Sequence, residues 1–238
     1  MKRALPCLAL VFAGCAGEQY RHPEPNPFSH VRKVVVVPVG DASGDRHFDA
    51  MKAGDALASE LLMHPGFTVV RPAEALAAAA AGAGDLSTIE GCLAVARALE
   101  ADAVLVADVT EQDAYYPPRT TVSVQFLVVR PPLAPAGDLQ RHVVSGRPLA
   151  VNLATAPHVN QEFEAVLDGS DDRVRAAVSS WAAARVDEES PWEDGEGVLR
   201  ARAPWWRFVC ARLIDRLLET ELGRQERSKP AWRNPERS

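Results

Sequence analysis

The sequence lacks the short motifs by which several classes of enzyme are identified. It contains no Gly-x-Ser-x-Gly nucleophile elbow, no His-Glu-x-x-His zinc motif and no Rossmann glycine fingerprint. The glycine-rich stretch 40–45 has no Gly-Lys-Ser/Thr ending, and its two aspartates, Asp41 and Asp45, would repel phosphate. The six histidines are scattered singly along the chain, which favours surface positions over metal ligands. We therefore predict no catalytic residues, no metal site and no cofactor.

One alternative stays open among the acidic residues. Strand ends gather loops at one edge of a sheet, so Asp41, Asp45 and Asp108 could lie close together there. A cluster of carboxylates can bind a divalent cation. Aspartate is also common in turns, and we prefer this simpler interpretation for all three.

The sequence also lacks an excess of basic residues. Its 26 lysines and arginines are outnumbered by 32 aspartates and glutamates, which gives a formal net charge of −6. A nucleic-acid-binding protein normally shows a basic surface, so we expect no nucleic-acid partner.

Long apolar runs are absent as well. The longest covers Ala4 to Ala13, behind the basic residues Lys2 and Arg3. Ten apolar residues are too few to cross a bilayer as a helix, but they suit the core of a signal peptide. We therefore predict that residues 1–14 are a signal peptide.

The residues Ala13-Gly14-Cys15 follow this apolar stretch. They resemble the lipobox of bacterial lipoproteins, although Phe12 stands where leucine is usual. The resemblance implies cleavage before Cys15, acylation of that residue and anchoring of the protein in a bilayer. Ala16 after the cysteine favours the periplasmic face of the outer membrane, again by resemblance. An ordinary secretory signal with a chance cysteine is the alternative.

Cysteine is scarce, with four residues in the whole chain. Cys7 would leave with the signal peptide, and Cys15 would carry lipid. Cys92 and Cys210 remain, and their spacing fits no metal motif. We predict two buried thiols, with a disulfide between them as the alternative in an oxidising compartment.

The mature chain begins with a proline-containing segment and continues into a predicted α/β domain. Residues 15–30 form the lipidated cysteine and an extended tether. The run Lys33 to Gly40 and the stretch Ala103 to Val109 are apolar at nearly every position, which is typical of strands covered on both faces. From Thr120 apolar and polar residues alternate, which indicates a half-buried antiparallel strand, and 141–151 is the predicted returning strand.

Apolar residues at helical spacing predict helices around these strands. A helix from about 50 to 63 is capped by Asp49, one from 73 to 81 follows Pro72, and one from about 87 to 100 starts at Ser87. Further helices start at Ser170 or Asp171 and at Pro204, the second ending near Leu222. Residues 187–197 are predicted to be an acidic, solvated loop.

The predicted fold class is α/β, of the sandwich type. We expect a mixed sheet of about five strands with helices on both faces and extra C-terminal helices. Residues 31–222 would form this single domain, and 223–238 a disordered tail.

The order of elements from Lys33 to Arg130 resembles a known family. Its most specific piece is the helix-to-strand transition Leu99-Glu100-Ala101-Asp102-Ala103-Val104-Leu105-Val106. The pattern is similar to the periplasmic domain shared by the curli secretion lipoprotein (CsgG-like), the penicillin-binding-protein activator LpoB and the TolB amino-terminal domain. This resemblance implies an α/β sandwich that binds envelope proteins without catalysis. The helix with Trp181 and the acidic loop have no counterpart in that pattern.

Three functions follow as hypotheses. The first is a membrane-anchored, non-catalytic binding or assembly factor of the cell envelope, with the bilayer and envelope proteins as partners. The second is a subunit of a CsgG-like secretion pore, which would need its spanning strands in Thr120–Val151. The third is a hydrolase with an unrecognised site. The sequence does not fix the oligomeric state.

Candidate partner contacts come from the aromatic residues. All five tryptophans follow residue 180, and tryptophan is enriched at interaction hot spots. Trp181 and Trp206 fall on apolar stripes and are predicted to be core residues. Trp192 and Trp205 are the predicted exposed contacts, together with Tyr115, Tyr116 and Arg119 of the loop before the alternating strand.

Overall fold

A computed structural model describes residues 23–129, 159–185 and 195–228. Its six strands form one mixed sheet in the order β3-β1-β4-β5-β6, with the short β2 paired to β4. The strands are β1 (Lys33–Val36), β2 (Gly40–Asp41), β3 (Thr68–Val70), β4 (Ala103–Asp113), β5 (Arg119–Val128) and β6 (Val159–Asp168). β1 pairs in parallel with β3 and β4, whereas β4, β5 and β6 are antiparallel. The predicted α/β class with a mixed sheet is confirmed.

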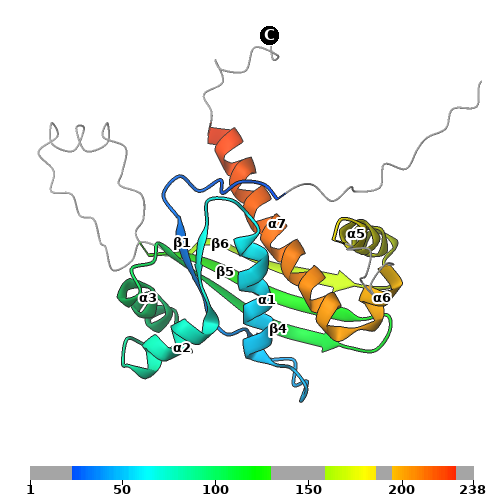
Figure 1. Cartoon of the computed structure of the whole chain (residues 1–238), viewed down its shortest axis with the longest axis horizontal. Coiled ribbons are helices and arrows are strands. Elements are labelled where there is room, and N and C mark those ends of the chain that lie inside the picture. Colours follow the sequence, from blue (N-terminus) through cyan, green and yellow to red (C-terminus); the bar gives the residue numbers. More distant parts are fainter. Residues whose placement is uncertain (1–22, 130–158, 186–194, 229–238) are drawn as a thin grey trace, which may run out of the picture.

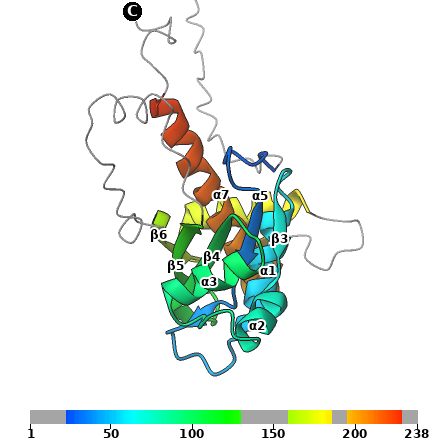
Figure 2. The same ribbon diagram turned by 90° about the vertical axis from the view of Figure 1, so that its left-hand side faces the viewer.

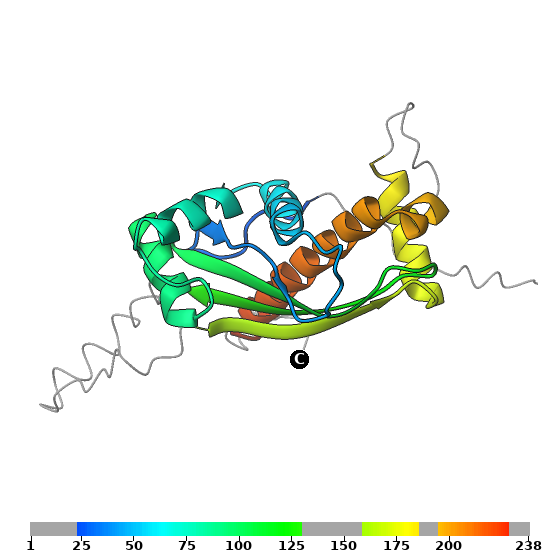
Figure 3. The ribbon, with the colours of Figure 1, turned by 90° about the horizontal axis from the view of Figure 1, so that it is seen from below.

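The helices pack on both faces of this sheet. They are α1 (Ala50–Leu62), α2 (Pro72–Ala80), α3 (Ile89–Ala98), α5 (Asp172–Ala183), α6 (Gly195–Arg200) and α7 (Arg202–Ser228). α1 and α7 lie side by side along one face of the strands, and α5 and α6 close one end of it (Figures 1 and 3). In Figure 2 α2 and α3 are nearest the viewer, in front of β4. Among the described residues, no helix is both long enough and apolar enough to cross a bilayer.

Burial on both faces explains the unbroken valine run of β1. Val34, Val35 and Val36 are all fully buried, but they belong to two different apolar cores. Val34 and Val36 pack in the larger core, with α1 and α7. Val35 packs in the smaller core, with α3, Val104 of β4 and Leu127 of β5. The three valine side chains therefore lose their contact with water on both faces of the sheet.

The strand that returns along β5 is not the predicted one. β6 pairs with β5 in antiparallel register, with Val124 opposite Phe163 and Val122 opposite Ala165. The segment 141–151 lies outside the described residues. Residues 162–165, Glu-Phe-Glu-Ala, alternate between polar and apolar side chains, but the Ala-Val-Leu run at 165–167 does not. The weak alternation, together with the prolines earlier in the chain, favoured a returning strand that is too early.

The helix boundaries follow the capping residues with several differences. Residues 195–200 form α6, although 187–197 were predicted to be a loop, and α7 starts at Arg202 and not at Pro204. Asp49, Pro72 and Asp171 stand at the predicted starts of their helices. α3 is capped by Thr88 and not by Ser87: the Thr88 side chain accepts a hydrogen bond from Gly91 N at 3.1 Å. α7 continues to Ser228, so residues 223–228 are helical and not part of a disordered tail.

Candidate functional site

The turn between β4 and β5 presents two tyrosines to solvent. Tyr115 is 85% exposed and Tyr116 is 45% exposed. Tyr115 N donates a hydrogen bond to Asp113 Oδ1 at 3.0 Å, which is the local bond of an aspartate turn. Beyond Tyr116 the chain passes Pro117 and Pro118, and Gly169 N, just after β6, donates to Pro118 O at 2.8 Å. The turn is therefore tied to the end of the sheet on both sides.

Tyr116 fixes this turn to α5 and α6. Its hydroxyl donates to Glu196 Oε2 at 2.7 Å, and the guanidinium of Arg200 lies 4.6 Å from the centre of its ring. Glu196 also forms an ion pair with Arg175 of α5. The hydrogen bond to Tyr116 and the charge of Glu196 raise the pKa of Arg175, so this guanidinium stays charged. Glu196 thus joins three elements at one point.

Arg119 lies at the base of the same turn. Its guanidinium is 3.6 Å from Glu111 Oε2 on the opposite strand, and Thr121 Oγ1 also donates to Glu111 at 3.2 Å. Both partners of the ion pair are about half exposed, so the pair adds little to stability. Its charged groups therefore remain accessible to a partner near the turn.

Three of the five predicted contacts therefore lie together: Tyr115, Tyr116 and Arg119. We call this group, with Arg175, Glu196 and Arg200, the hairpin tip. Trp192 lies outside the described residues. The sequence does not indicate that Arg175, Glu196 and Arg200 join the site, because each lies more than 50 residues away from Tyr116 along the chain.

The prediction that Trp205 is exposed is wrong. Trp205 is 2% exposed, and its Nε1 donates to Thr120 Oγ1 at 2.9 Å. α7 starts at Arg202, so Trp205 lies in the first turn of this helix, where it faces β5. The predictions for Trp181 and Trp206 are confirmed, because these residues are 6% and 8% exposed.

Two of the three aspartates considered as a cation site have other partners. Asp45 forms an ion pair with Arg202 at 2.7 Å, and Asp41 Oδ1 accepts hydrogen bonds from Ser43 N and Oγ. Asp108 lies against Gly40 in the neighbouring strand, and burial raises its pKa. In the part of the chain that the structure describes, no three acidic, histidine or cysteine side chains are placed to hold a metal ion.

Cys92 and Cys210 are free thiols, and both are buried. Cys92 belongs to the smaller core and Cys210 to the larger one, so the sheet separates them. Burial raises the pKa of both thiols. The predicted pair of buried thiols is confirmed, and neither has the lowered pKa of a reactive cysteine.

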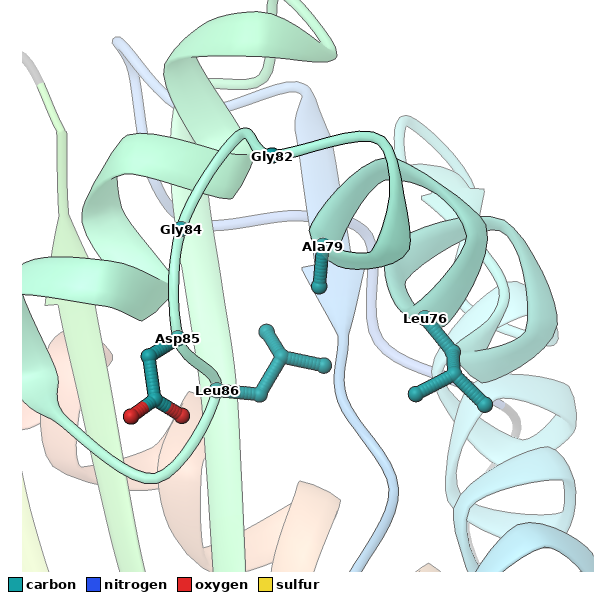
Figure 4. Close-up of a pocket in the computed structure, with 6 residues that line it drawn as sticks. All are labelled: Leu76, Ala79, Gly82, Gly84, Asp85 and Leu86. Carbon is teal, nitrogen blue, oxygen red and sulfur yellow. The ribbon is translucent and has the colours of Figure 1, made fainter.

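A shallow pocket of about 450 Å³ lies between α2 and the loop that follows it. Figure 4 shows Leu76 and Leu86 on opposite sides of it, with Gly82 and Gly84 in the loop above. Its single charged residue, Asp85, uses Oδ1 to accept a hydrogen bond from Ser87 N. Polar groups do not converge on this pocket as they do in most ligand sites, so the hairpin tip is the better candidate.

Comparison with known proteins gives structural likeness alone. No family model matches the chain, and no curated protein matches its sequence. The LpoB C-terminal domain from Salmonella enterica aligns over 58% of this chain and 82% of its own, with 14% identity and a TM-score of 0.38. The lipoprotein GNA1162 from Neisseria meningitidis aligns over 57% of this chain and 79% of its own, with 16% identity and a TM-score of 0.36. A hypothetical protein from Chlamydia trachomatis aligns over 77% and 95%, with 15% identity and a TM-score of 0.36. These scores are low, so we argue function from the residues of the chain itself.

Proposed function

We propose that this protein is a lipid-anchored, non-catalytic binding factor of the bacterial cell envelope. In this proposal Cys15 carries the acyl chains on the periplasmic face of the outer membrane. The hairpin tip contacts an envelope protein. The observation on which the proposal depends is Tyr115, an 85% exposed aromatic residue at the end of a turn that its neighbours hold in place.

The bracing of the turn supports a role in binding. Fixing a side chain at an interface costs free energy, and a turn that is already ordered avoids part of that cost. Tyr116 and its partners order the turn, so Tyr115 needs only to lose the freedom of its own side chain. Exposed tyrosines with an adjacent arginine are also typical of interaction hot spots.

The direction of the hairpin tip supports the same proposal. The N-terminal segment enters the fold beside the last turns of α7, where Gln225 Nε2 donates to Pro27 O. The hairpin tip lies at the other end of α7, beside α6 and the start of that helix (Figure 1). A helix of 27 residues is about 40 Å long. A tether from Cys15 would therefore attach the domain at the end opposite the hairpin tip, which leaves the tip free to contact a periplasmic partner.

The pore subunit gains no support from β5, the described part of its predicted spanning region. β5 is hydrogen-bonded on both sides, and its apolar face packs in the larger core with α7. A strand covered in this way has no apolar face to offer to lipid.

The anchor is tested by replacing Cys15 with serine and fractionating cells. The wild-type protein is expected in the membrane fraction, with the added mass of its acyl chains, and Cys15→Ser in the soluble fraction without it. Membrane association of Cys15→Ser at the wild-type level, with equal masses, would contradict the anchor.

The binding surface is tested by placing a photo-crosslinking amino acid at position 115 in cells. A crosslinked protein of defined mass is expected from position 115 and not from Met63, which is also apolar and is 55% exposed but lies on another surface. Tyr115→Ala should then weaken capture of that protein by at least tenfold without lowering the Tm. Equal crosslinking from both positions, or undiminished capture by Tyr115→Ala, would contradict a role for the hairpin tip.

A further inference from the structure

All the acidic side chains of β4 and β6 lie on one face of the sheet. They are Asp108, Glu111, Asp113, Glu162, Glu164 and Asp168. Each of them is opposite residue 119, 121, 123 or 125 of β5, and alternate residues of a strand point to the same face. β4, β5 and β6 together contain one basic residue, Arg119. We call these six carboxylates the acidic face.

The described helices leave this face open to water. α1 and α7 pack on the opposite face of the strands, in the larger core (Figure 3). On the acidic side, the smaller core includes Val104 of β4 and Leu127 of β5, but no residue of β6 among those that the structure describes. Five of the six acidic residues are exposed, and Asp168 is partly buried. The acidic face therefore holds like charges close together without a covering layer, which favours a cationic partner.

The outer edge of β6, next to this face, has backbone groups available for pairing. β6 is the last described strand on its side of the sheet. Gly169 N donates to Pro118 O across the β5–β6 pair, so residues 162, 164 and 166 direct their backbone groups to the outer edge. Of these groups, Glu164 O accepts a hydrogen bond from Arg216 Nη1 at 2.6 Å, and no described residue engages the others. The side chain of Val166 is 53% exposed. An edge of this kind is a template for a further strand.

We propose that the edge of β6 binds a basic, extended segment of another protein, which pairs with β6 as an additional strand beside the acidic face. Alternate side chains of such a strand lie over the acidic face, where lysine or arginine meets Glu162 and Glu164. The remaining side chains lie toward α7, beside the partly buried Phe163, which favours apolar residues there. The partner is therefore a segment in which basic and apolar residues alternate.

A second copy of the chain fits this edge less well. Two β6 strands paired edge to edge would place the glutamates of both copies on one continuous face, where like charges oppose each other. The interaction is also independent of the proposed anchor and of the hairpin tip, because the residues that carry it include neither Cys15 nor the two tyrosines of the turn.

Binding of a labelled peptide tests the proposal directly. The protein is residues 15–238 with Cys15→Ser, which keeps every described residue. The probe is a short peptide in which lysine and valine alternate. Its control keeps the lysines but has prolines in place of the internal valines, so that it cannot form a paired strand. Fluorescence anisotropy should show the alternating peptide binding about tenfold more tightly than its control, with binding that weakens as salt is added. Equal binding of the two peptides, or no binding of the alternating one, would overturn the proposal.

Two variants with the same change in net charge separate the acidic face from overall charge. Glu162→Gln combined with Glu164→Gln should weaken binding of the alternating peptide by about tenfold, because each exposed ion pair adds a few-fold to affinity. Glu219→Gln combined with Glu226→Gln, at exposed positions on α7, should bind the peptide within about twofold of the parent. Equal loss in both variants would mean that net charge alone attracts the peptide, which would overturn the proposal.

Amide hydrogen exchange locates the added strand. The alternating peptide should slow exchange at Glu164 and Val166, whose N–H groups point to the outer edge, and leave exchange in α2 unchanged. Unchanged exchange at both residues with saturating peptide would overturn pairing with β6. Slow exchange at both residues without the peptide would overturn it as well, because the edge would then already be paired, for example with a second copy. None of these outcomes bears on the hairpin tip or on acylation of Cys15, which have their own tests.

Discussion

The indole of Trp205 is buried between α7 and β5, and its one polar atom needs a partner there. Thr120 Oγ1 supplies it at 2.9 Å, and Thr120 is itself fully buried. Thr120→Val keeps the shape of the side chain but removes the acceptor, leaving the indole N–H unpaired. We expect this change to lower the free energy of unfolding by about 1–3 kcal/mol, measured by urea titration.

Thr110→Val is the matched control, because Thr110 lies on the same hairpin but is exposed. It should change stability by less than about 0.5 kcal/mol. If the two changes lower the free energy of unfolding equally, the buried hydrogen bond between Thr120 and Trp205 adds nothing measurable to stability.

Asp215 provides a prediction on pH. Burial is the main cause that raises the pKa of this carboxyl, and Arg212, 3.4 Å away, only partly offsets it. His64 and Arg185 also lower the pKa, whereas Glu219 raises it. With its pKa raised in the folded state, the ionised carboxylate destabilises the fold above that pKa, and the effect disappears as the pH falls below the usual aspartate value.

Asp215→Asn should therefore raise the Tm relative to wild type more at about pH 7 than at about pH 3. Thermal unfolding by circular dichroism at several pH values measures the difference. A Tm difference that stays constant, or grows as the pH falls, would mean that the ion pair with Arg212 outweighs the cost of burial.

Glu60 shows why a single residue can escape sequence analysis. The apolar spacing of α1 predicts a charged residue at this position on the solvent-facing side, yet Glu60 is 2% exposed. Arg185 donates to both of its carboxylate oxygens, at 2.7 and 2.6 Å, from 125 positions further along the chain. Spacing within a helix reports only which residues share a face, and a partner so distant in sequence leaves no local pattern.

At the scale of elements, α7 contributes most to the larger core. It places four large side chains there, each at most 2% exposed: Trp205, Phe208, Leu213 and Leu217. Leu217→Ala should cost about 2–5 kcal/mol, because it removes buried methyl groups and leaves a cavity. Leu222→Ala, one turn later on the same helix at a residue that is 36% exposed, should cost less than about 1 kcal/mol.

Urea titration of both variants compares the two leucines directly. A cost for Leu217→Ala no larger than that for Leu222→Ala would mean that α7 packs on the sheet less closely than its burial indicates.

The sequence predicts the strands that are apolar on both faces and the helices that start at a recognisable capping residue. β1 and β4 are apolar on both faces, and α1, α2 and α5 start at recognisable residues, so these elements are predicted within a few positions. β6 was missed because its partner strand is separated from it by a long stretch rich in proline and small residues. The sequence predicts only part of the hairpin tip. Tyr115 and Tyr116 are recognisable because they stand in a loop next to two prolines. The residues of α5 and α6 that contact them are brought there only by the fold.

At the scale of the molecule, the two apolar cores share the same strands. β1, β4 and β5 each send alternate side chains into the larger core and into the smaller one. These strands carry apolar side chains on both faces, and loss of either core would expose one set to water, so loss of one core should destabilise the other. This is the physical basis for proposing that residues 31–222 form a single domain.

The distribution of tryptophan allows a test of this coupling. Trp181, Trp205 and Trp206 all lie in the larger core, so their fluorescence reports on that side of the sheet. Leu93, 2% exposed, belongs to the smaller core on the opposite side. Leu93→Ala should therefore lower the urea midpoint of the tryptophan transition by as much as that of the far-ultraviolet circular dichroism, with a cost of about 2–5 kcal/mol. If the dichroism transition shifts while the fluorescence transition stays where it is in the wild type, the two faces unfold independently and the single-domain proposal is wrong.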